Sequence, residues 1–199
     1  MSNKKIIWIV GGMASGKSTL RNQLIEYLST SSPKLISTDT QEYVDGGRVA
    51  AIGNCLKGNQ CDGLDSSFGK LKKDGAIRNV EHCVKHHEIT LIEGSQTSAQ
   101  WIIPLCEICL NYDCEFILIH LNLRLWENYQ RLRKRILESG KTEKDITDSK
   151  LDSIRAKNSQ AKFISEQCSR TEFVKIITID TEGMEFEETL KAVLKRIKL

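Results

Sequence analysis

The stretch Gly11-Gly12-Met13-Ala14-Ser15-Gly16-Lys17-Ser18 decides the fold of this chain. It matches the pattern G-x-x-x-x-G-K-[S/T] in full, and it stands between the apolar run Ile6 to Val10 and a segment of helical periodicity that begins near Lys17. A strand before the glycines and a helix after them is the context in which this pattern forms a P-loop, a turn that surrounds phosphate oxygens with backbone N–H groups. The sequence therefore predicts a nucleotide-binding chain.

Each residue type in this loop has a chemical reason. The glycines let successive N–H groups point inward, and the start of the following helix adds partial positive charge. Lys17 places a cation against the β- and γ-phosphates, and the Ser18 hydroxyl is a natural ligand of Mg²⁺. We therefore expect ATP and Mg²⁺ as cofactors, held by Gly11, Gly12, Met13, Ala14, Ser15, Gly16, Lys17, Ser18 and Thr19.

The rest of the chain alternates between short apolar runs and helical stretches. The apolar runs, rich in β-branched residues, predict strands at Ile6 to Val10, Leu35 to Ser37, Ile89 to Ile92, Glu115 to Leu121 and Phe173 to Ile179. Helices are expected at about 17–30, 68–87, 97–112, 124–139, 148–168 and 184–197. Such repetition implies right-handed crossovers and a parallel sheet. We expect one doubly wound α/β domain over residues 1–199.

Two acidic residues directly follow predicted strands, where ligands of an open parallel sheet bind. Asp39 ends Leu-Ile-Ser-Thr-Asp, and we interpret it as the catalytic base that orients and deprotonates an acceptor hydroxyl. The alternative for Asp39 is a helix N-cap, with Glu42 completing a capping box. Glu93 ends Thr-Leu-Ile-Glu and is expected to hold Mg²⁺ through water or to act as the base itself, because a carboxylate after so apolar a strand needs a partner.

A basic segment, residues 124–157, carries the excess positive charge of the chain. It holds ten basic and six acidic residues, a net charge of +4, whereas the whole chain carries +3. Four apolar residues form one helical face, Leu125, Tyr129, Leu132 and Ile136. Arg131 and Arg135 share another face, and we interpret the segment as a lid that closes these guanidinium groups over the phosphates. The alternative is a solvated charged helix with pairs such as Glu127 and Arg131.

A glycine-rich stretch interrupts the alternation. Five of the thirteen glycines lie between Gly46 and Gly63, which predicts a loop over about residues 46–67. Long loops are uncommon in compact domains unless they have a function, so we expect this one to contact substrate, with a surface excursion as the alternative. Seven cysteines without a secretory signal are expected to be free thiols, although Cys55 with Cys61 and Cys106 with Cys109 leave a zinc site open.

The N-terminus carries no export signal by its pattern. Only five apolar residues separate its lysines from the glycines, which is too short for the core of a signal peptide, and the longest other apolar runs are strand-sized. We expect a cytoplasmic protein, in the host cytoplasm if the source is viral, and no membrane contact.

With the P-loop, Asp39, the Ile92-Glu93-Gly94 strand end and the arginine-rich segment together, the chain resembles the small P-loop kinases that act on gluconate, nucleosides, nucleotides and polynucleotides. The resemblance covers nearly the whole chain. It implies a three-layer P-loop kinase fold with a five-stranded parallel sheet in the order 2-3-1-4-5 and a helical lid. It also implies transfer of the γ-phosphate of ATP to a hydroxyl group.

A narrower resemblance concerns the substrate loop. The segments Ala51-Ile52-Gly53-Asn54-Cys55 and Gln60-Cys61-Asp62-Gly63-Leu64-Asp65-Ser66 are similar to the loop of bacteriophage kinases that phosphorylate 5-hydroxymethyluracil in DNA. That loop carries Leu-Gly-x-Tyr and Cys-Gly-Gly-x-Asp, from which this chain departs at Asn54-Cys55 and Cys61-Asp62-Gly63. The resemblance implies a DNA partner, an extruded base recognised by Asn54 and Asp65, and phosphate contacts from the basic segment.

Two other functions remain open. One is a kinase of a free nucleoside, nucleotide or sugar acid, which would have a closed pocket rather than an open basic groove. The other is a P-loop ATPase or switch protein that controls a partner, and it would hydrolyse ATP without transfer to any hydroxyl group. The missing Asp-Glu pair of an ordinary motor ATPase argues against the second.

Overall fold

One seven-stranded sheet organises the chain. The structure is a computed structural model that describes residues 4–56, 64–94 and 99–198, without the side chains of residues 64–69 and 99. The strand order is β2-β3-β4-β5-β1-β6-β7. The strands are β1 Lys5–Gly11, β2 Lys34–Ser37, β3 Glu42–Asp45, β4 Val49–Ile52, β5 Ile89–Glu93, β6 Glu115–Asn122 and β7 Val174–Asp180.

The five strands from β4 to β7 in this order are parallel and keep the predicted order. Numbered along the chain as β1, β4, β5, β6 and β7, they lie in the sheet as 2-3-1-4-5. The prediction of a five-stranded, purely parallel sheet is wrong, because β2 and β3 add an antiparallel hairpin at the β4 edge. The sheet is therefore mixed.

The second parallel strand lies where the sequence predicted a loop. It is β4, Val49–Ile52, and all four of its residues are buried. The segment assigned to that place, Leu35 to Ser37, forms β2 at the sheet edge instead, with its ends exposed. Only Val49 and Ile52 at its ends favour a strand, and the two central alanines carry little strand preference, so burial under neighbouring elements rather than local propensity decides this strand.

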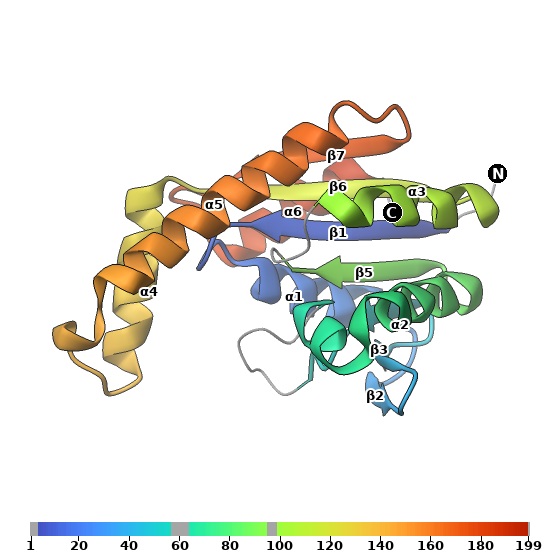
Figure 1. Cartoon of the computed structure of the whole chain (residues 1–199), viewed down its shortest axis with the longest axis horizontal. Coiled ribbons are helices and arrows are strands. Elements are labelled where there is room, and N and C mark those ends of the chain that lie inside the picture. The colour runs from blue at the N-terminus through green and yellow to red at the C-terminus, as the bar shows by residue number, and fades with distance from the viewer. Residues whose placement is uncertain (1–3, 57–63, 95–98, 199) are drawn as a thin grey trace.

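Helices cover both faces of the sheet in three layers (Figure 1). One face packs Ile6, Trp8 and Val10 of β1 against α2, α3 and α5, and the other packs Ile7 and Ile9 against α1 and α6. Burying each such side chain contributes roughly 1.5–3 kcal/mol. The helices are α1 Lys17–Leu28, α2 Leu64–His86, α3 Ile102–Asn111, α4 Leu125–Glu138, α5 Asp148–Cys168 and α6 Phe186–Ile197.

The helical hairpin of α4 and α5 projects beyond the carboxyl end of β1 (Figure 1). Leu132, Ile136 and Ile154 form a small apolar cluster between the two helices, and Met13 and Ala14 of the glycine-rich loop pack against it. The segment expected to be a lid, residues 124–157, therefore forms a helical hairpin seated on that loop, and the rest of α5 packs on the sheet. Among the described residues, no helix combines the length and the apolar character needed to cross a bilayer.

Candidate active site

The glycine-rich loop joins β1 to α1 as the motif predicts. Gly16 takes a left-handed conformation, with φ 93°, directly before the first residue of α1. A Cβ on Gly11 would stand 2.5 Å from Ser15 Oγ and 2.8 Å from the Leu121 carbonyl oxygen, so the first glycine is required by space. Lys17 Nζ donates a hydrogen bond to the Gly12 carbonyl oxygen at 2.8 Å, and this folds the lysine back over the loop.

The P-loop serine faces the acid at the end of β5. Ser18 Oγ lies 3.3 Å from both carboxylate oxygens of Glu93. On the other side of that carboxylate, Arg21 Nη1 donates to Glu93 Oε2 at 2.6 Å. Arg21 stands one helical turn after Ser18 on α1, so the helix presents both groups to the same carboxylate. The partner that the buried Glu93 was expected to need is Arg21.

These residues fit a nucleotide with its metal ion. Ser15 Oγ is buried and has no hydrogen-bond partner among the described residues, which leaves one polar group of the loop available to a phosphate. Ser18 and Glu93 supply the hydroxyl and carboxylate oxygens that Mg²⁺ takes when most of its other ligands are phosphates and waters. Within the described residues there is no group of three or more His, Cys, Asp or Glu side chains able to hold a metal on its own.

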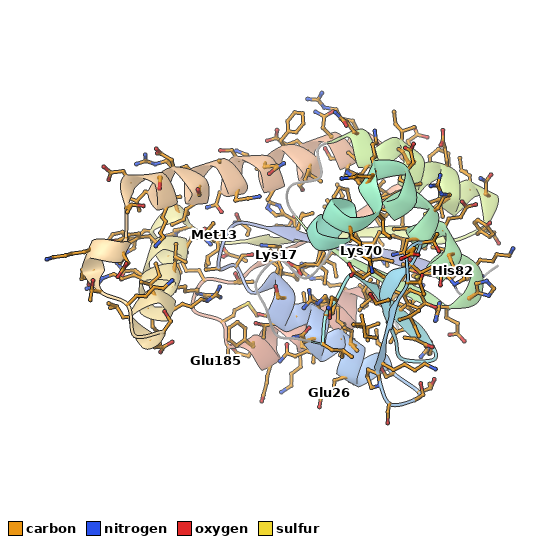
Figure 2. The ribbon with its side chains drawn as sticks, turned by 60° about the horizontal axis from the view of Figure 1, so that its bottom comes forward. Met13, Lys17, Glu26, Lys70, His82 and Glu185 are labelled. Carbon is orange, nitrogen blue, oxygen red and sulfur yellow. The ribbon has the colours of Figure 1, made fainter. Side chains whose placement is uncertain are left out.

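A pocket of about 770 Å³ opens beside the loop. It lies between the start of α1, the outer face of α4 and the turn before α6, and Met13, Lys17 and Glu185 mark its surroundings in Figure 2. Its lining includes Gly16 and Thr19 of the loop and Gly183 and Phe186 of that turn. The pocket is large enough for a nucleoside group next to the phosphate site.

The two predicted lid arginines line this pocket. Arg131 Nη2 donates to the Thr181 carbonyl oxygen at 2.9 Å, and Arg131 Nε lies 3.3 Å from Glu127. Arg135 is exposed one turn further along α4. Arg133 also borders the pocket, but its guanidinium group pairs with Glu143. The helix therefore brings Arg131 and Arg135 to the same pocket.

The structure does not bring Asp39 to this site. Asp39 is exposed in the turn between β2 and β3, and β2 is the fourth strand from β1, a separation of about 19 Å at about 4.8 Å per strand. The premise of the base assignment, that Asp39 follows the second parallel strand, is wrong. The helix-cap alternative is wrong as well, because strand β3 follows and Thr38 Oγ1 accepts the hydrogen bonds of this turn from the backbone N–H groups of residues 40 and 41.

Asn54 takes the place at which Asp39 was expected. It follows β4, after Gly53 with φ 93°, and its Oδ1 atom is buried without a hydrogen-bond partner among the described residues. An unpaired buried carbonyl oxygen is costly, so this atom is suited to receive a donor from a ligand. The other predicted substrate contact, Asp65, lies in the first turn of α2, and its side chain is outside the described residues.

Sequence reasoning missed three polar residues at the site, namely Arg21, Asn128 and Asn158. Asn128 Nδ2 donates to the Met13 carbonyl oxygen at 2.6 Å, and Asn158 Nδ2 donates to Asn128 Oδ1 at 2.6 Å. The signal for Asn128 was its place on the apolar face of α4, four residues before Leu132. A buried amide on an apolar helical face needs a hydrogen-bond partner.

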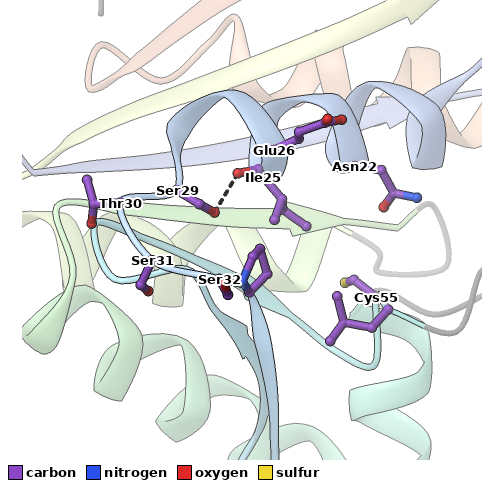
Figure 3. Close-up of a pocket in the computed structure, with 10 residues that line it drawn as sticks. Asn22, Ile25, Glu26, Ser29, Thr30, Ser31, Ser32 and Cys55 are labelled. Atoms are coloured by element: carbon purple, nitrogen blue, oxygen red, sulfur yellow. Dashed lines mark hydrogen bonds between the residues drawn. The ribbon is translucent and has the colours of Figure 1, made fainter.

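A second pocket, of about 590 Å³, lies on the far side of α1 from the lid. Figure 3 shows it between the end of α1, the chain leading into β2 and Cys55. Four of its ten lining residues, at positions 29–32, carry hydroxyl groups, and Ser29 Oγ donates to the Ile25 carbonyl oxygen at 2.6 Å. Cys55 is one of six cysteines in the described part of the chain, whereas Cys61 of the suggested zinc pair lies outside it.

Comparison with known proteins defines the fold. No protein-family model and no curated protein matches the chain. Among solved structures, a candidate kinase from Chloroflexus aurantiacus J-10-fl is 12% identical, with 100% of this chain and 98% of that chain covered and a TM-score of 0.53. The protein APE1195 is 13% identical, with 100% and 97% covered and a TM-score of 0.52.

A deoxyadenosine kinase from M. mycoides with bound dCTP is also similar. It is 13% identical, with 97% of this chain and 98% of that chain covered and a TM-score of 0.49. We infer shared architecture from the two preceding structures, with TM-scores of 0.53 and 0.52, and their low identities leave the substrate open. The chain therefore has the three-layer α/β architecture found in P-loop kinases, with two additional antiparallel strands at one edge.

Proposed function

We propose that this chain is an ATP-dependent kinase that transfers the γ-phosphate to a hydroxyl group of a small molecule, of the nucleoside, nucleotide or sugar-acid class. The observation that carries the proposal is the convergence of Lys17, Ser18 and the buried Glu93 at the carboxyl end of β1 and β5, next to a pocket lined by Arg131 and Arg135. A P-loop, a metal-holding carboxylate and lid guanidinium groups are the parts that phosphoryl transfer requires.

The residues have separate roles in this proposal. The backbone N–H groups of residues 11–16 and the N-terminus of α1 bind the phosphates, and Mg²⁺, when bound, supplies charge neutralisation at the transferring group. Lys17 and Arg131 hold positive charge where negative charge builds up. Both oxygens of Glu93 already accept hydrogen bonds from Ser18 or Arg21, and this favours metal positioning over proton abstraction as its role.

The acceptor is placed beyond the carboxyl end of β4. Asn54 stands there with a buried oxygen that has no hydrogen-bond partner in the described part of the chain and that can accept a hydrogen bond from a hydroxyl or amine group. The comparisons give no support to 5-hydroxymethyluracil in DNA as the acceptor, so the free small molecule replaces it as the favoured substrate.

The deciding experiment follows labelled γ-phosphate from ATP, with Mg²⁺, into a panel of acceptors. The panel holds ribo- and deoxynucleosides, nucleoside monophosphates, sugar acids, and duplex DNA with and without 5-hydroxymethyluracil. We expect label on one class of free small molecule and a loss on the order of a thousandfold in Lys17→Ala. Label on the modified DNA alone would restore the DNA-base kinase, and ATP hydrolysis without any labelled acceptor would favour a switch ATPase.

A further inference from the structure

Two asparagines from the lid helices reach the glycine-rich loop one behind the other. Asn128 of α4 is fully buried and donates from Nδ2 to the Met13 carbonyl oxygen at 2.6 Å. Asn158 of α5 donates from Nδ2 to Asn128 Oδ1, also at 2.6 Å. Both lid helices are thus joined to the loop by a single chain of hydrogen bonds.

The orientation of both amide groups is fixed by the first acceptor, the Met13 carbonyl oxygen. A backbone carbonyl oxygen can only accept, so Asn128 must turn its NH₂ group toward Met13 and its oxygen toward Asn158. Asn158 must then present its own NH₂ group to Asn128, which directs its oxygen to the other side. Each amide can therefore serve its neighbour in one orientation only.

The last atom of this series of hydrogen-bonded amides, Asn158 Oδ1, lies against Gly12. Asn158 Oδ1 occupies the place that a Cβ on Gly12 would take, and Asn158 Cγ lies 2.6 Å from that point. Gly12 is not among the described residues with positive φ, so its backbone conformation suits any residue and the contact alone demands glycine. The Gly12 carbonyl oxygen in turn accepts the hydrogen bond of Lys17 Nζ. Lys17 and Asn128 therefore hold two successive peptide groups, one on either side of Met13, and Asn158 lies against Gly12.

Holding the two helices together does not need these amides. Leu132, Ile136 and Ile154 already join α4 to α5 through apolar contact. A pair of amides, one fully buried and one half-buried, contributes less to stability than apolar residues of the same size, so their hydrogen bonds need another explanation. The use that the contacts offer is to fix the peptide groups at Gly12 and Met13 relative to the lid.

We propose that Asn128 and Asn158 are positioning residues that couple the lid to the P-loop, so that the loop keeps its phosphate-binding shape while the two helices are seated on it. The proposal rests on the proposed function in one respect, that nucleotide phosphates bind at this loop. Conversely, phosphates that order the loop would favour the seated position of the lid, because the coupling between two equilibria is reciprocal.

A double-mutant cycle between the loop and the lid tests this coupling. Asn158→Ala removes the amide that lies on Gly12, and Gly12→Ala places a methyl group where that amide sits. The readout is the affinity for ADP with Mg²⁺ by titration calorimetry, which needs no acceptor. We expect each single variant to bind ADP about tenfold more weakly. This loss lies within the factor of about 2 to 150 by which residues in contact influence each other.

The double variant decides the matter. With the amide gone, the new methyl group has room, so Gly12→Ala with Asn158→Ala should bind ADP at least as tightly as Gly12→Ala alone. Losses that multiply to about a hundredfold, or an Asn158→Ala variant with wild-type affinity, would overturn the proposal. Ser159→Ala, at the exposed neighbouring position of α5, is the matched control and should bind ADP normally.

Two further readouts separate positioning from simple support. Asn158→Asp keeps the shape of the side chain but cannot donate to Asn128, so it should weaken ADP binding as Asn158→Ala does. The melting temperature of both Asn158 variants should fall by the same few degrees, because each variant leaves Asn128 Oδ1 buried without its donor. A weakened affinity explained by a large loss of melting temperature would count against positioning. The two proposals can fail separately. If ADP binds and the effects of the Gly12 and Asn158 substitutions are coupled, but no acceptor is labelled, then the proposed kinase activity is wrong and the coupling between loop and lid is supported.

Discussion

Arg21 Nη1 lies 2.6 Å from Glu93 Oε2, and the two side chains are 1% and 8% exposed. A buried pair of this kind gains its attraction at the cost of removing two charges from water, so it is weak evidence for stability by itself. Its effect here is geometric. Arg21 holds Glu93 against α1 at the level of Ser18, and the carboxylate is thereby fixed beside the phosphate site.

Removing one member of this pair should destabilise the fold strongly. Arg21→Met leaves the Glu93 carboxylate buried without its cation, and we expect a loss of about 3–5 kcal/mol in the free energy of unfolding. Urea denaturation measures this loss. The double variant Arg21→Met with Glu93→Leu should be less destabilised than Arg21→Met, because no uncompensated charge remains. A double variant that is less stable than the single one would show that the pair itself stabilises the protein.

The lid arginine that donates to the Thr181 carbonyl oxygen, Arg131, should affect transfer more than folding. Arg131→Met removes a guanidinium group from the pocket, and we expect kcat to fall by about 10²–10³-fold, as for other single groups that stabilise developing charge. Arg170→Met, at an exposed position after α5, is the matched control and should leave kcat unchanged. Equal kcat values for both variants would assign α4 to the class of solvated charged helices.

Asn54, and not Asp39, follows the second parallel strand, and this difference gives a paired prediction. Asp39→Asn should change transfer by less than about twofold, because a base must lie within hydrogen-bond reach of the proton that it takes. Asn54→Ala should raise KM for the acceptor by about tenfold, the value of one hydrogen bond, with kcat little changed. Steady-state kinetics on the acceptor identified by labelling measures both, and loss of transfer in Asp39→Asn would return that residue to the site.

A histidine in β6 predicts how stability depends on pH. Burial lowers the pKa of His120 from its ordinary value of 6.5, so the unfolded chain takes up this proton more readily than the folded one. The contribution of neutral His120 is full above about pH 6.5 and is lost as the pH falls through the lowered folded pKa.

Comparing two slopes tests this prediction. The free energy of unfolding of the wild type should fall more steeply between about pH 7.5 and 5 than that of His120→Gln, whose side chain does not titrate. The comparison cancels any constant effect of the substitution. His82, whose pKa is lowered first by burial and then by neighbouring cations, is present in both proteins. Parallel profiles would contradict the assignment.

The parts of the fold that local pattern could predict are those in which pattern and burial agree. The loop from Gly11 to Ser18 and the amphipathic helices α4 and α5 were predicted within a few residues. β4 was missed because Val-Ala-Ala-Ile between glycines has no strand pattern of its own, and its identity depends on neighbours distant in sequence. Because β4 was not predicted, Asp39 rather than Asn54 was assigned to the position after the second parallel strand.

The site shows the same division. Lys17, Ser18, Glu93, Arg131 and Arg135 carry chemistry that a motif or a helical spacing reveals. Ser18 lies beside Glu93, and both arginines line the neighbouring pocket. Arg21, Asn128 and Asn158 act through partners that are 72, 115 and 30 residues away in the chain. No local pattern encodes such pairings, although a charged or amide side chain on an apolar helical face signals that a partner exists.

The short hairpin of β2 and β3 also bears on how the molecule behaves in a crowded solution. Without it, the outer strand would be β4, four fully buried and uncharged residues whose backbone groups would be open to another chain. With it, the sheet ends at β2, four residues long, with Lys34 exposed at its start. Short edge strands that carry lysine resist pairing with other copies, so the hairpin protects this chain against aggregation through that side of the sheet.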